Sequence, residues 1–229
     1  IIIFFLSILG NTLVWKYGLR LIKQNRFQSH DTHKIQTSRL GGIIIFASLF
    51  LLSLITANKW LTNLLIFSLI IIIPAFMEDL HYKISPIIRL VLSLISSLFI
   101  ILSIPELPMF EFGKINFLVN NNLFQIIFFT FALAGLTNGQ NIIDGTNGLS
   151  AFTSIITITC ILYISIIVKD YQASFVTISC IVLLISFLFI NYPFGFIFLG
   201  DSGSYLLGIL SGYLIIKIFG ENPDIPTWS

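Results

Sequence analysis

Long apolar runs that recur along the whole chain place the strongest limit on what it can fold into. They approach about 20 residues, the length that a helix needs to cross the hydrocarbon core of a bilayer. Hydrophobic residues make up 56% of the 229 residues and charged residues only 10%, which is too little charge to cover a soluble domain of this length. Because the alternating pattern of a membrane β-barrel is absent, the sequence predicts an all-α, polytopic helical membrane protein.

Eight candidate transmembrane spans account for these runs. Their approximate bounds are 1–22, 40–57, 61–77, 87–104, 121–137, 149–168, 174–190 and 202–219. Ser85 followed by Pro86 predicts a capped helix start with proline in the first turn. Gly208 and Gly212 form a GxxxG pattern, which predicts that the last span packs closely against another helix.

Residues 1–229 are expected to form one transmembrane domain of a longer protein, because the chain begins without methionine and stops soon after the last span. Cys160 and Cys180 lie inside apolar runs, so we expect them to be packing residues without a disulfide or metal role. The net charge of +2 gives no indication of a nucleic-acid partner.

Four polar segments fall on one side of the membrane. Segments 23–39, 78–85, 138–148 and 191–201 are each two spans apart, and an even number of crossings returns the chain to the same side. Eight basic residues lie on this side and four on the other, so the positive-inside rule places the polar segments in the cytoplasm. The eight are Lys16, Arg20, Lys23, Arg26, Lys34, Arg39, Lys83 and Arg89, and the four are Lys59, Lys114, Lys169 and Lys217.

These polar segments carry acids and amides at the ends of separate spans. The residues are Glu78, Asp79, Asp144 and Asp201, with Asn138, Asn141 and Asn147. A carboxylate at a span end costs free energy unless it meets a cation or lines an aqueous cavity, so we predict that the acids converge on one site. Carboxylate and amide oxygens suit a hard ion, magnesium first and manganese second. The nearby basic residues Lys34, Arg39, Lys83 and Arg89 suit an anionic substrate.

Each of these residues also has a simpler interpretation. A lone acid at a span end is usually a solvated interfacial residue, and basic residues in a loop usually only set the topology. Asparagines beside glycines commonly form caps and turns. The joint pattern, in which several acids lie on one side of the membrane, favours the functional interpretation.

Four motifs in order carry a family resemblance. They are SRLGG (38–42), MEDLHYKISPIIRL (77–90), NGQNIIDGTNGLS (138–150) and NYPFGFIFLGDSGSYLLG (191–208). Over about residues 1–219 the chain resembles the polyprenyl-phosphate N-acetylhexosamine-1-phosphate transferases, glycosyltransferase family 4. The resemblance implies transfer of a sugar-1-phosphate from a UDP-N-acetylhexosamine to undecaprenyl phosphate at the cytoplasmic membrane, with magnesium and release of UMP. The family includes the enzymes that start peptidoglycan, O-antigen and teichoic acid lipids.

The resemblance also implies roles for the acids. Glu78 and Asp79 match the acidic pair of the family, with Asp79 as candidate general base and Glu78 orienting it or touching the metal. Asp144 matches the acid of the NxxDGxxGL motif, as a metal ligand or a residue that positions the nucleophile. Asp201 matches the GDxGS aspartate, which implies a magnesium ligand.

The amides and basic residues are implied to contact the metal or the substrate. Asn141 matches an asparagine near the metal and diphosphate, and Asn147 falls near the uracil. Lys34 and Arg39 match basic residues near phosphate, and Lys83 and Asn138 complete the predicted substrate-binding set.

Three departures from the family pattern limit what the resemblance implies. The acidic pair is Glu78-Asp79 where Asp-Asp is commoner, which marks a subgroup that resembles N-acetylglucosamine-type enzymes. Asn147 in place of aspartate points away from the peptidoglycan enzyme. A late histidine-rich loop and the two final spans of the family are missing from this chain.

Two rival functional classes stay open, a secondary transporter and a truncated non-catalytic relative. A homodimer also stays open.

Overall fold

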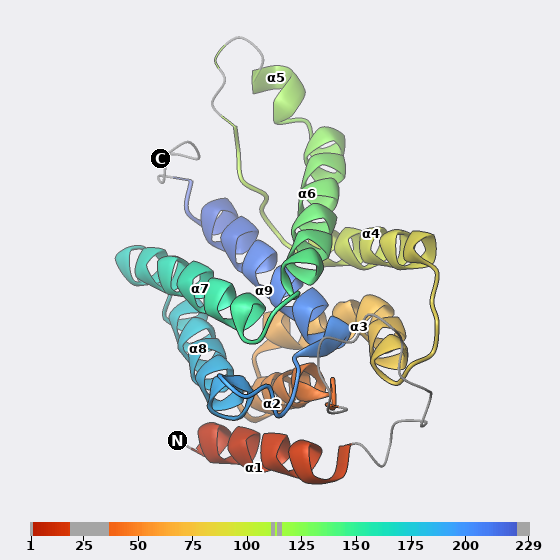
Figure 1. Ribbon diagram of the computed structural model, residues 1–229. Helices are drawn as coiled ribbons and strands as arrows, with labels where there is room; N and C mark the ends of the chain where they lie inside the picture. Colours follow the sequence, from red (N-terminus) through yellow and green to blue (C-terminus); the bar gives the residue numbers. More distant parts are fainter. Residues whose placement is uncertain (1, 19–36, 111–112, 114–115, 224–229) are drawn as a thin grey trace.

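The computed structural model describes residues 2–18, 37–110, 113 and 116–223, and these residues form a helical bundle (Figure 1). The helices in this part of the chain are α1 (Ile2–Tyr17), α2 (Gly41–Ile55), α3 (Lys59–Asp79), α4 (Pro86–Leu102), α5 (Asn116–Val119), α6 (Asn122–Ile143), α7 (Leu149–Ile167), α8 (Tyr171–Asn191) and α9 (Gly200–Glu221). The isolated bridge between Ser38 and Ile197 is the one β-contact in the described ranges.

The predicted polytopic membrane fold is confirmed. In the described part of the chain five helices, α3, α6, α7, α8 and α9, are long and apolar enough to cross a membrane, and α2 and α4 are shorter apolar helices. Pro86 occupies the first turn of α4 as predicted, although the Ser85 side chain makes no cap hydrogen bond. Cys180 is buried in the core, Cys160 is exposed, and both are free thiols.

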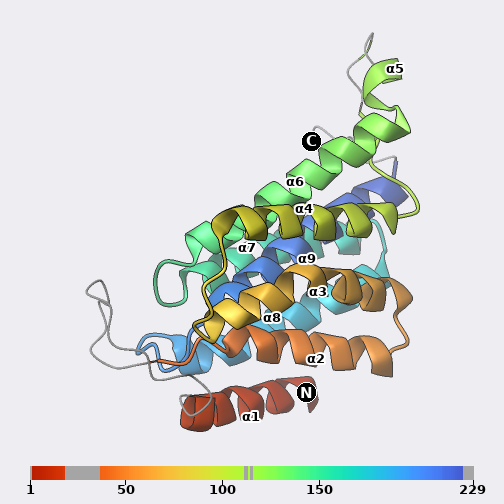
Figure 2. The same ribbon diagram turned by 90° about the vertical axis from the view of Figure 1, so that its right-hand side faces the viewer.

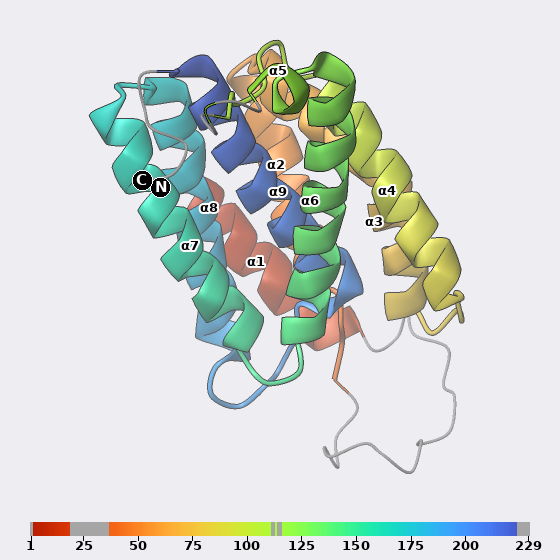
Figure 3. The same cartoon turned by 90° about the horizontal axis from the view of Figure 1, so that it is seen from above.

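Helix α9 forms the centre of the bundle (Figure 3). In its most apolar stretch 83% of the residues are buried, against 28% to 61% in the other four long helices. It contacts α2, α3, α4, α6 and α7. A Cβ added to Gly208 would lie 2.6 Å from the Thr137 Cα, and one added to Gly212 would lie 2.6 Å from the Leu133 Cδ1, which confirms the predicted close packing against α6.

The connections α3–α4, α6–α7 and α8–α9 lie at the same end of the bundle (Figure 2). We call this the acidic end, because it holds Glu78, Asp79, Asp144 and Asp201. Residues 38–42 join it through backbone hydrogen bonds, from the Phe198 N–H to the Ser38 carbonyl and from the Gly42 N–H to the Leu199 carbonyl. Helices α3, α6, α8 and α9 extend further than the apolar runs indicated, whereas α2 and α7 do not. Several predicted site residues therefore lie on helix turns rather than in connections, namely Glu78, Asp79, Asn138, Asn141 and Asp201.

The two ends of the bundle differ in how their helices begin. At the far end, side chains cap α3, α6 and α8: Asn58 accepts from the Leu61 N–H, Asn121 from the Leu123 N–H and Asp170 from the Ala173 N–H. At the acidic end, the residues before α2, α4, α7 and α9 make no side-chain cap hydrogen bond; they are Leu40, Ser85, Gly148 and Leu199. The first N–H groups of a helix need partners. Those at the acidic end must therefore find them elsewhere.

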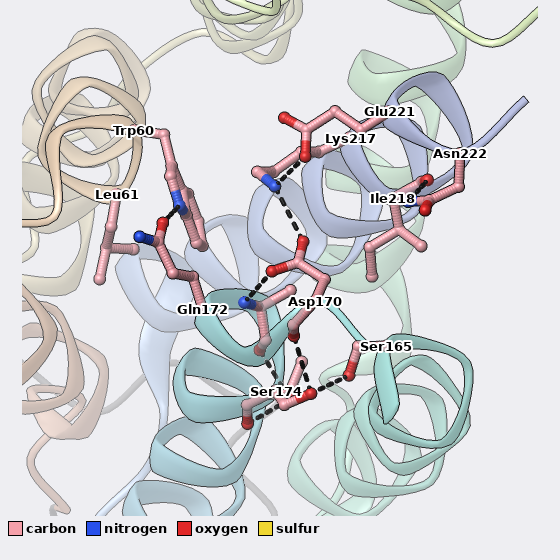
Figure 4. Close-up of polar contacts among 12 residues, drawn as sticks. Trp60, Leu61, Ser165, Asp170, Gln172, Ser174, Lys217, Ile218, Glu221 and Asn222 are labelled. Carbon is pink, nitrogen blue, oxygen red and sulfur yellow. Dashed lines mark hydrogen bonds and ion pairs between the residues drawn. The ribbon is translucent and has the colours of Figure 1, made fainter. Parts of the chain in front are cut away.

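At the far end, Lys217 anchors the last turn of α9 (Figure 4). Its ammonium lies 3.0 Å from the Asp170 Oδ2, pairs with Glu221 one turn away, and sits 5.3 Å from the centre of the Trp60 ring. The side chain of Lys217 is only 6% exposed. This cluster joins the end of α9 to the starts of α8 and α3.

Candidate functional site

The acidic end collects the four predicted acids from three helices. Glu78 and Asp79 form the last turn of α3, Asp144 follows the last residue of α6, and Asp201 lies in the first turn of α9. Glu78 is within electrostatic range of Asp201, and so is Asp144. The structure therefore contains the convergence that the sequence predicts, while the roles of the individual residues stay predictions.

One arginine lies between two of these acids. The Arg89 Nη1, from the start of α4, is 2.9 Å from the Asp201 Oδ2 and 3.2 Å from the Glu78 Oε2. Because a single cation faces two carboxylates, the cluster of Glu78, Arg89 and Asp201 keeps a net negative charge. It also joins α3, α4 and α9 at one point.

The hydrogen bonding of this cluster is incomplete. The Glu78 Oε2 is buried and, despite its ion-pair distance from Arg89, has no partner in hydrogen-bond geometry, and the Arg89 Nε is also buried without a partner. A buried polar atom without a hydrogen bond costs about 1–3 kcal/mol. A bound water, ion or ligand that supplies the missing contacts is one explanation of such a cost.

Asp79 points into the start of α9. Its Oδ1 accepts a hydrogen bond from the Asp201 N–H at 2.7 Å, and its Oδ2 accepts from the Ser202 N–H at 3.0 Å and the Ser202 hydroxyl at 2.6 Å. The residue is 1% exposed. Both carboxylate oxygens of Asp79 are therefore used within the protein.

Asp144 has an unusual titration for a residue outside the spans. Burial, together with the negative charge of Asp201, raises the pKa of Asp144 to about 7, and the opposing effect of Arg39 is smaller. Asp144 can therefore gain or lose a proton near neutral pH, which suits a group that exchanges protons with a substrate.

The predicted amides tie helices together. Asn141 donates to the Ser204 hydroxyl of α9 at 2.9 Å, and Asn138 donates to the Ser93 hydroxyl of α4 at 2.8 Å. Asn147 donates to the Pro193 carbonyl at 3.4 Å, between the α6–α7 and α8–α9 connections. Their predicted contacts with metal or substrate stay predictions.

The predicted basic residues have different positions. Arg39 is exposed and within electrostatic range of both Glu78 and Asp144. Lys83 is exposed in the α3–α4 connection, and the described contacts of the acids do not include it. Lys34 lies outside the described residues.

The cluster has the donor chemistry of a hard-cation site. The carboxylates of Glu78 and Asp201 face one point, which Arg89 occupies. Among the described residues no group of three or more His, Cys, Asp or Glu side chains is placed to hold a metal ion. A magnesium ion here would take its remaining ligands from water, amide oxygens or substrate phosphates, as this ion commonly does. The site built on Asp201 and Asn141 stays a prediction.

The sequence analysis places Arg89 among the basic residues that set the topology and suit an anionic substrate, but it misses the position of Arg89 between the acids. A signal was available, because a cation in the first turn of a helix opposes the helix dipole. Its presence three residues after Pro86 indicates that other charges nearby require it. Ser202, directly after Asp201, was missed in the same way.

Comparison with known proteins agrees with these motifs. The model of "Glycosyl transferase family 4" matches residues 61–219. A Saccharolobus solfataricus protein, whose assigned name is UDP-N-acetylglucosamine–dolichyl-phosphate N-acetylglucosaminephosphotransferase, is 30% identical over 236 residues, which cover 96% of this chain and 70% of the relative. A phospho-N-acetylmuramoyl-pentapeptide-transferase of Campylobacter jejuni is 31% identical over 225 residues, which cover 81% of this chain and 62% of the relative. The chain thus spans about two thirds of the length of these relatives.

The matched region contains Glu78, Arg89, Asp144 and Asp201, so the acids that meet at one end of the bundle lie inside the part that defines the family. The chain therefore belongs to glycosyl transferase family 4.

Proposed function

We propose that the protein transfers a sugar-1-phosphate, of the N-acetylglucosamine type, from a UDP-sugar to polyprenyl phosphate on the cytoplasmic side of the membrane, with release of UMP and dependence on magnesium. The observation that carries this proposal is the pair of carboxylates, Glu78 and Asp201, that face one position at the end of a membrane bundle. The names of the relatives support the substrate class.

The reaction must overcome repulsion between two anions. An oxygen of the lipid phosphate attacks the phosphorus that bears the sugar, and the bond from that phosphorus to the UMP oxygen breaks. The Glu78 and Asp201 carboxylates, which pair with Arg89 in this structure, would hold a divalent cation once the Arg89 side chain moves aside, and the cation would supply charge neutralisation at the diphosphate. Arg89 and Arg39 add positive charge near the same position. The starts of α4 and α7, which have no side-chain caps, add positive partial charge at this end.

Proton transfer has a smaller part in this scheme. The second pKa of a phosphate monoester is near 6, so the lipid phosphate is mostly dianionic at neutral pH. When the monoanion binds, its proton can pass to Asp144, whose pKa of about 7 matches the task. The sequence analysis favours Asp79 as the candidate base. Its occupied oxygens favour Asp144 instead.

The test is transfer of radiolabelled N-acetylglucosamine-1-phosphate from its UDP donor to undecaprenyl phosphate by membranes that contain the protein. We expect a lipid-linked product and an equal amount of UMP, both dependent on magnesium. Labelled solute that crosses sealed vesicles without a lipid product would instead identify a transporter. Absence of both product and transport would indicate a non-catalytic relative.

A further inference from the structure

We infer that Asp79 is a positioning residue, which fixes the first turn of α9 and thereby the Asp201 carboxylate, rather than a group that reacts with substrate. The inference deepens the proposed function and depends on it for its kinetic test only.

The first argument is the hydrogen bonding of Asp79. Three donors occupy its two oxygens, at 2.7, 3.0 and 2.6 Å, and all three belong to Asp201 and Ser202. Hydrogen bonds to an ionised carboxylate are roughly twice as strong as those between neutral groups. A general base must present a free oxygen to the proton that it accepts. Donors fill three of the roughly four acceptor sites of the Asp79 carboxylate, and the residue is 1% exposed, so neither oxygen is open to a substrate proton unless the start of α9 comes apart.

The second argument is that α9 needs a cap from elsewhere. Its own N-cap residue, Leu199, has no side chain that could accept a hydrogen bond. The N–H groups of Asp201 and Ser202 are among the first of the helix and have no partner within it. Asp79 accepts from both, and its negative charge lies at the positive end of the helix dipole. The last turn of α3 therefore caps α9.

The third argument is the close packing around this contact. Gly200 has φ +77°, and a Cβ on it would lie 2.2 Å from the Arg39 carbonyl oxygen and 2.6 Å from the Asp79 Oδ1. A Cβ on Gly42 would lie 2.2 Å from the Gly203 nitrogen. The junction has no space for one added carbon, so substrate cannot approach the Asp79 carboxylate there.

The geometry of α3 explains why adjacent acids have different functions. Consecutive residues of an α-helix point about 100° apart, so Glu78 and Asp79 cannot face the same point. Glu78 faces Arg89 and keeps a buried oxygen without a hydrogen bond. Asp79 faces the backbone of α9. The acidic pair thus combines one group that faces the site with one that holds the helix carrying Asp201.

The kinetic test uses Asp79→Asn and Ser202→Ala. The amide that Asp79→Asn introduces keeps the volume but offers one acceptor oxygen where the carboxylate offers two, so we expect kcat to fall roughly ten- to hundredfold, the change for losing a charge-assisted hydrogen bond. KM for the UDP-sugar and the pH at half-maximal rate should not change. Ser202→Ala should lower kcat less, and the double variant should fall by less than the product of the two single effects. Ser211→Ala is the matched control, because within the described residues the Ser211 hydroxyl bonds only carbonyls of its own helix, those of Leu207 and Gly208.

Two outcomes would overturn the inference. The first is loss of the acidic limb of the pH–rate profile in Asp79→Asn, which identifies a titrating base. The second is independent, multiplicative effects of Asp79→Asn and Ser202→Ala. The same double-mutant cycle measured by thermal unfolding in detergent needs no activity. Coupling there would support the cap even if the protein catalysed no transfer, and additivity there would refute it.

Discussion

Each end of α9 holds one cation between two carboxylates, yet the two clusters differ in how completely they are satisfied. The clusters are Arg89 with Glu78 and Asp201 at the acidic end, and Lys217 with Asp170 and Glu221 at the far end. At the far end Asp170 uses one oxygen to cap α8 and the other to bind Lys217, whose ammonium also meets the Trp60 ring. That cluster is complete without a ligand.

The cluster at the acidic end is incomplete. The Glu78 Oε2 and the Arg89 Nε are buried without hydrogen bonds, and Asp144 adds further negative charge nearby. The starts of α4 and α7 at this end also lack side-chain caps, whereas those of α3, α6 and α8 at the far end have them. The comparison shows one cluster whose polar contacts are complete within the fold, and one at the acidic end that has contacts left for a bound group.

The largest expected effect separates the two ends at their aspartates. Asp201→Asn should abolish UMP release while the protein stays folded in detergent, because the amide removes a charge from the proposed cation site. Asp170→Asn should keep the rate per folded molecule and lower the thermal unfolding temperature. Assays of released UMP measure the reaction rate, and thermal scans of intrinsic fluorescence measure the unfolding temperature. Full turnover by Asp201→Asn at saturating magnesium would contradict the proposal that Asp201 serves catalysis and Asp170 serves stability.

Removing the central cation sharpens the comparison. Lys217→Met should destabilise the fold by about 3–5 kcal/mol, the usual cost of breaking a buried ion pair, because Asp170 keeps its charge without Lys217. Arg89→Met should lower kcat/KM by roughly a hundredfold, about 2.7 kcal/mol, with a smaller loss of stability. Denaturant titration and steady-state kinetics on the same preparations provide the two values. If Arg89→Met lost more stability than Lys217→Met, the cluster at the acidic end would be the one that stabilises the fold.

A third prediction concerns pH. Because the folded pKa of Asp144 is about 7 and its ordinary value is 3.8, the folded state binds the proton more tightly. Its contribution to stability is therefore full below pH 3.8 and is lost as pH rises to about 7. The transfer rate should rise through the same upper range as Asp144 ionises. Both trends should weaken in Asp144→Asn, and unchanged profiles would rule out titration of this group.

The smallest effect is expected for Glu78→Asp. The shorter side chain removes one methylene and restores the acidic pair that is commoner in the family, so measurable activity should remain, reduced several-fold. The rate at which the lipid-linked product forms measures the activity of this variant. A folded but inactive variant would show that the contact between Glu78 and Arg89 tolerates no change in reach.

The helices and the meeting of the acids were predictable, because apolar runs set the spans and an even number of crossings fixes a side. The different functions of Glu78 and Asp79 were not, since they depend on the rotation of α3 about its axis relative to α9. The sequence identifies Lys217 only as a topology charge, because its partner Asp170 is the N-cap residue of another helix, far away in the sequence. Short polar contacts between helices leave no periodic signal.

Because α9 carries a charge cluster near each end, the helix also defines a membrane thickness. Asp201 and Glu221 are separated by twenty residues of continuous helix, about 30 Å at 1.5 Å per residue. This length equals the hydrocarbon thickness of an ordinary bilayer. A thicker bilayer would draw charged groups into the acyl chains at one end or tilt the helix, and a thinner one would expose apolar turns. A bilayer of about this thickness would therefore place the two charge clusters of α9 at its opposite surfaces.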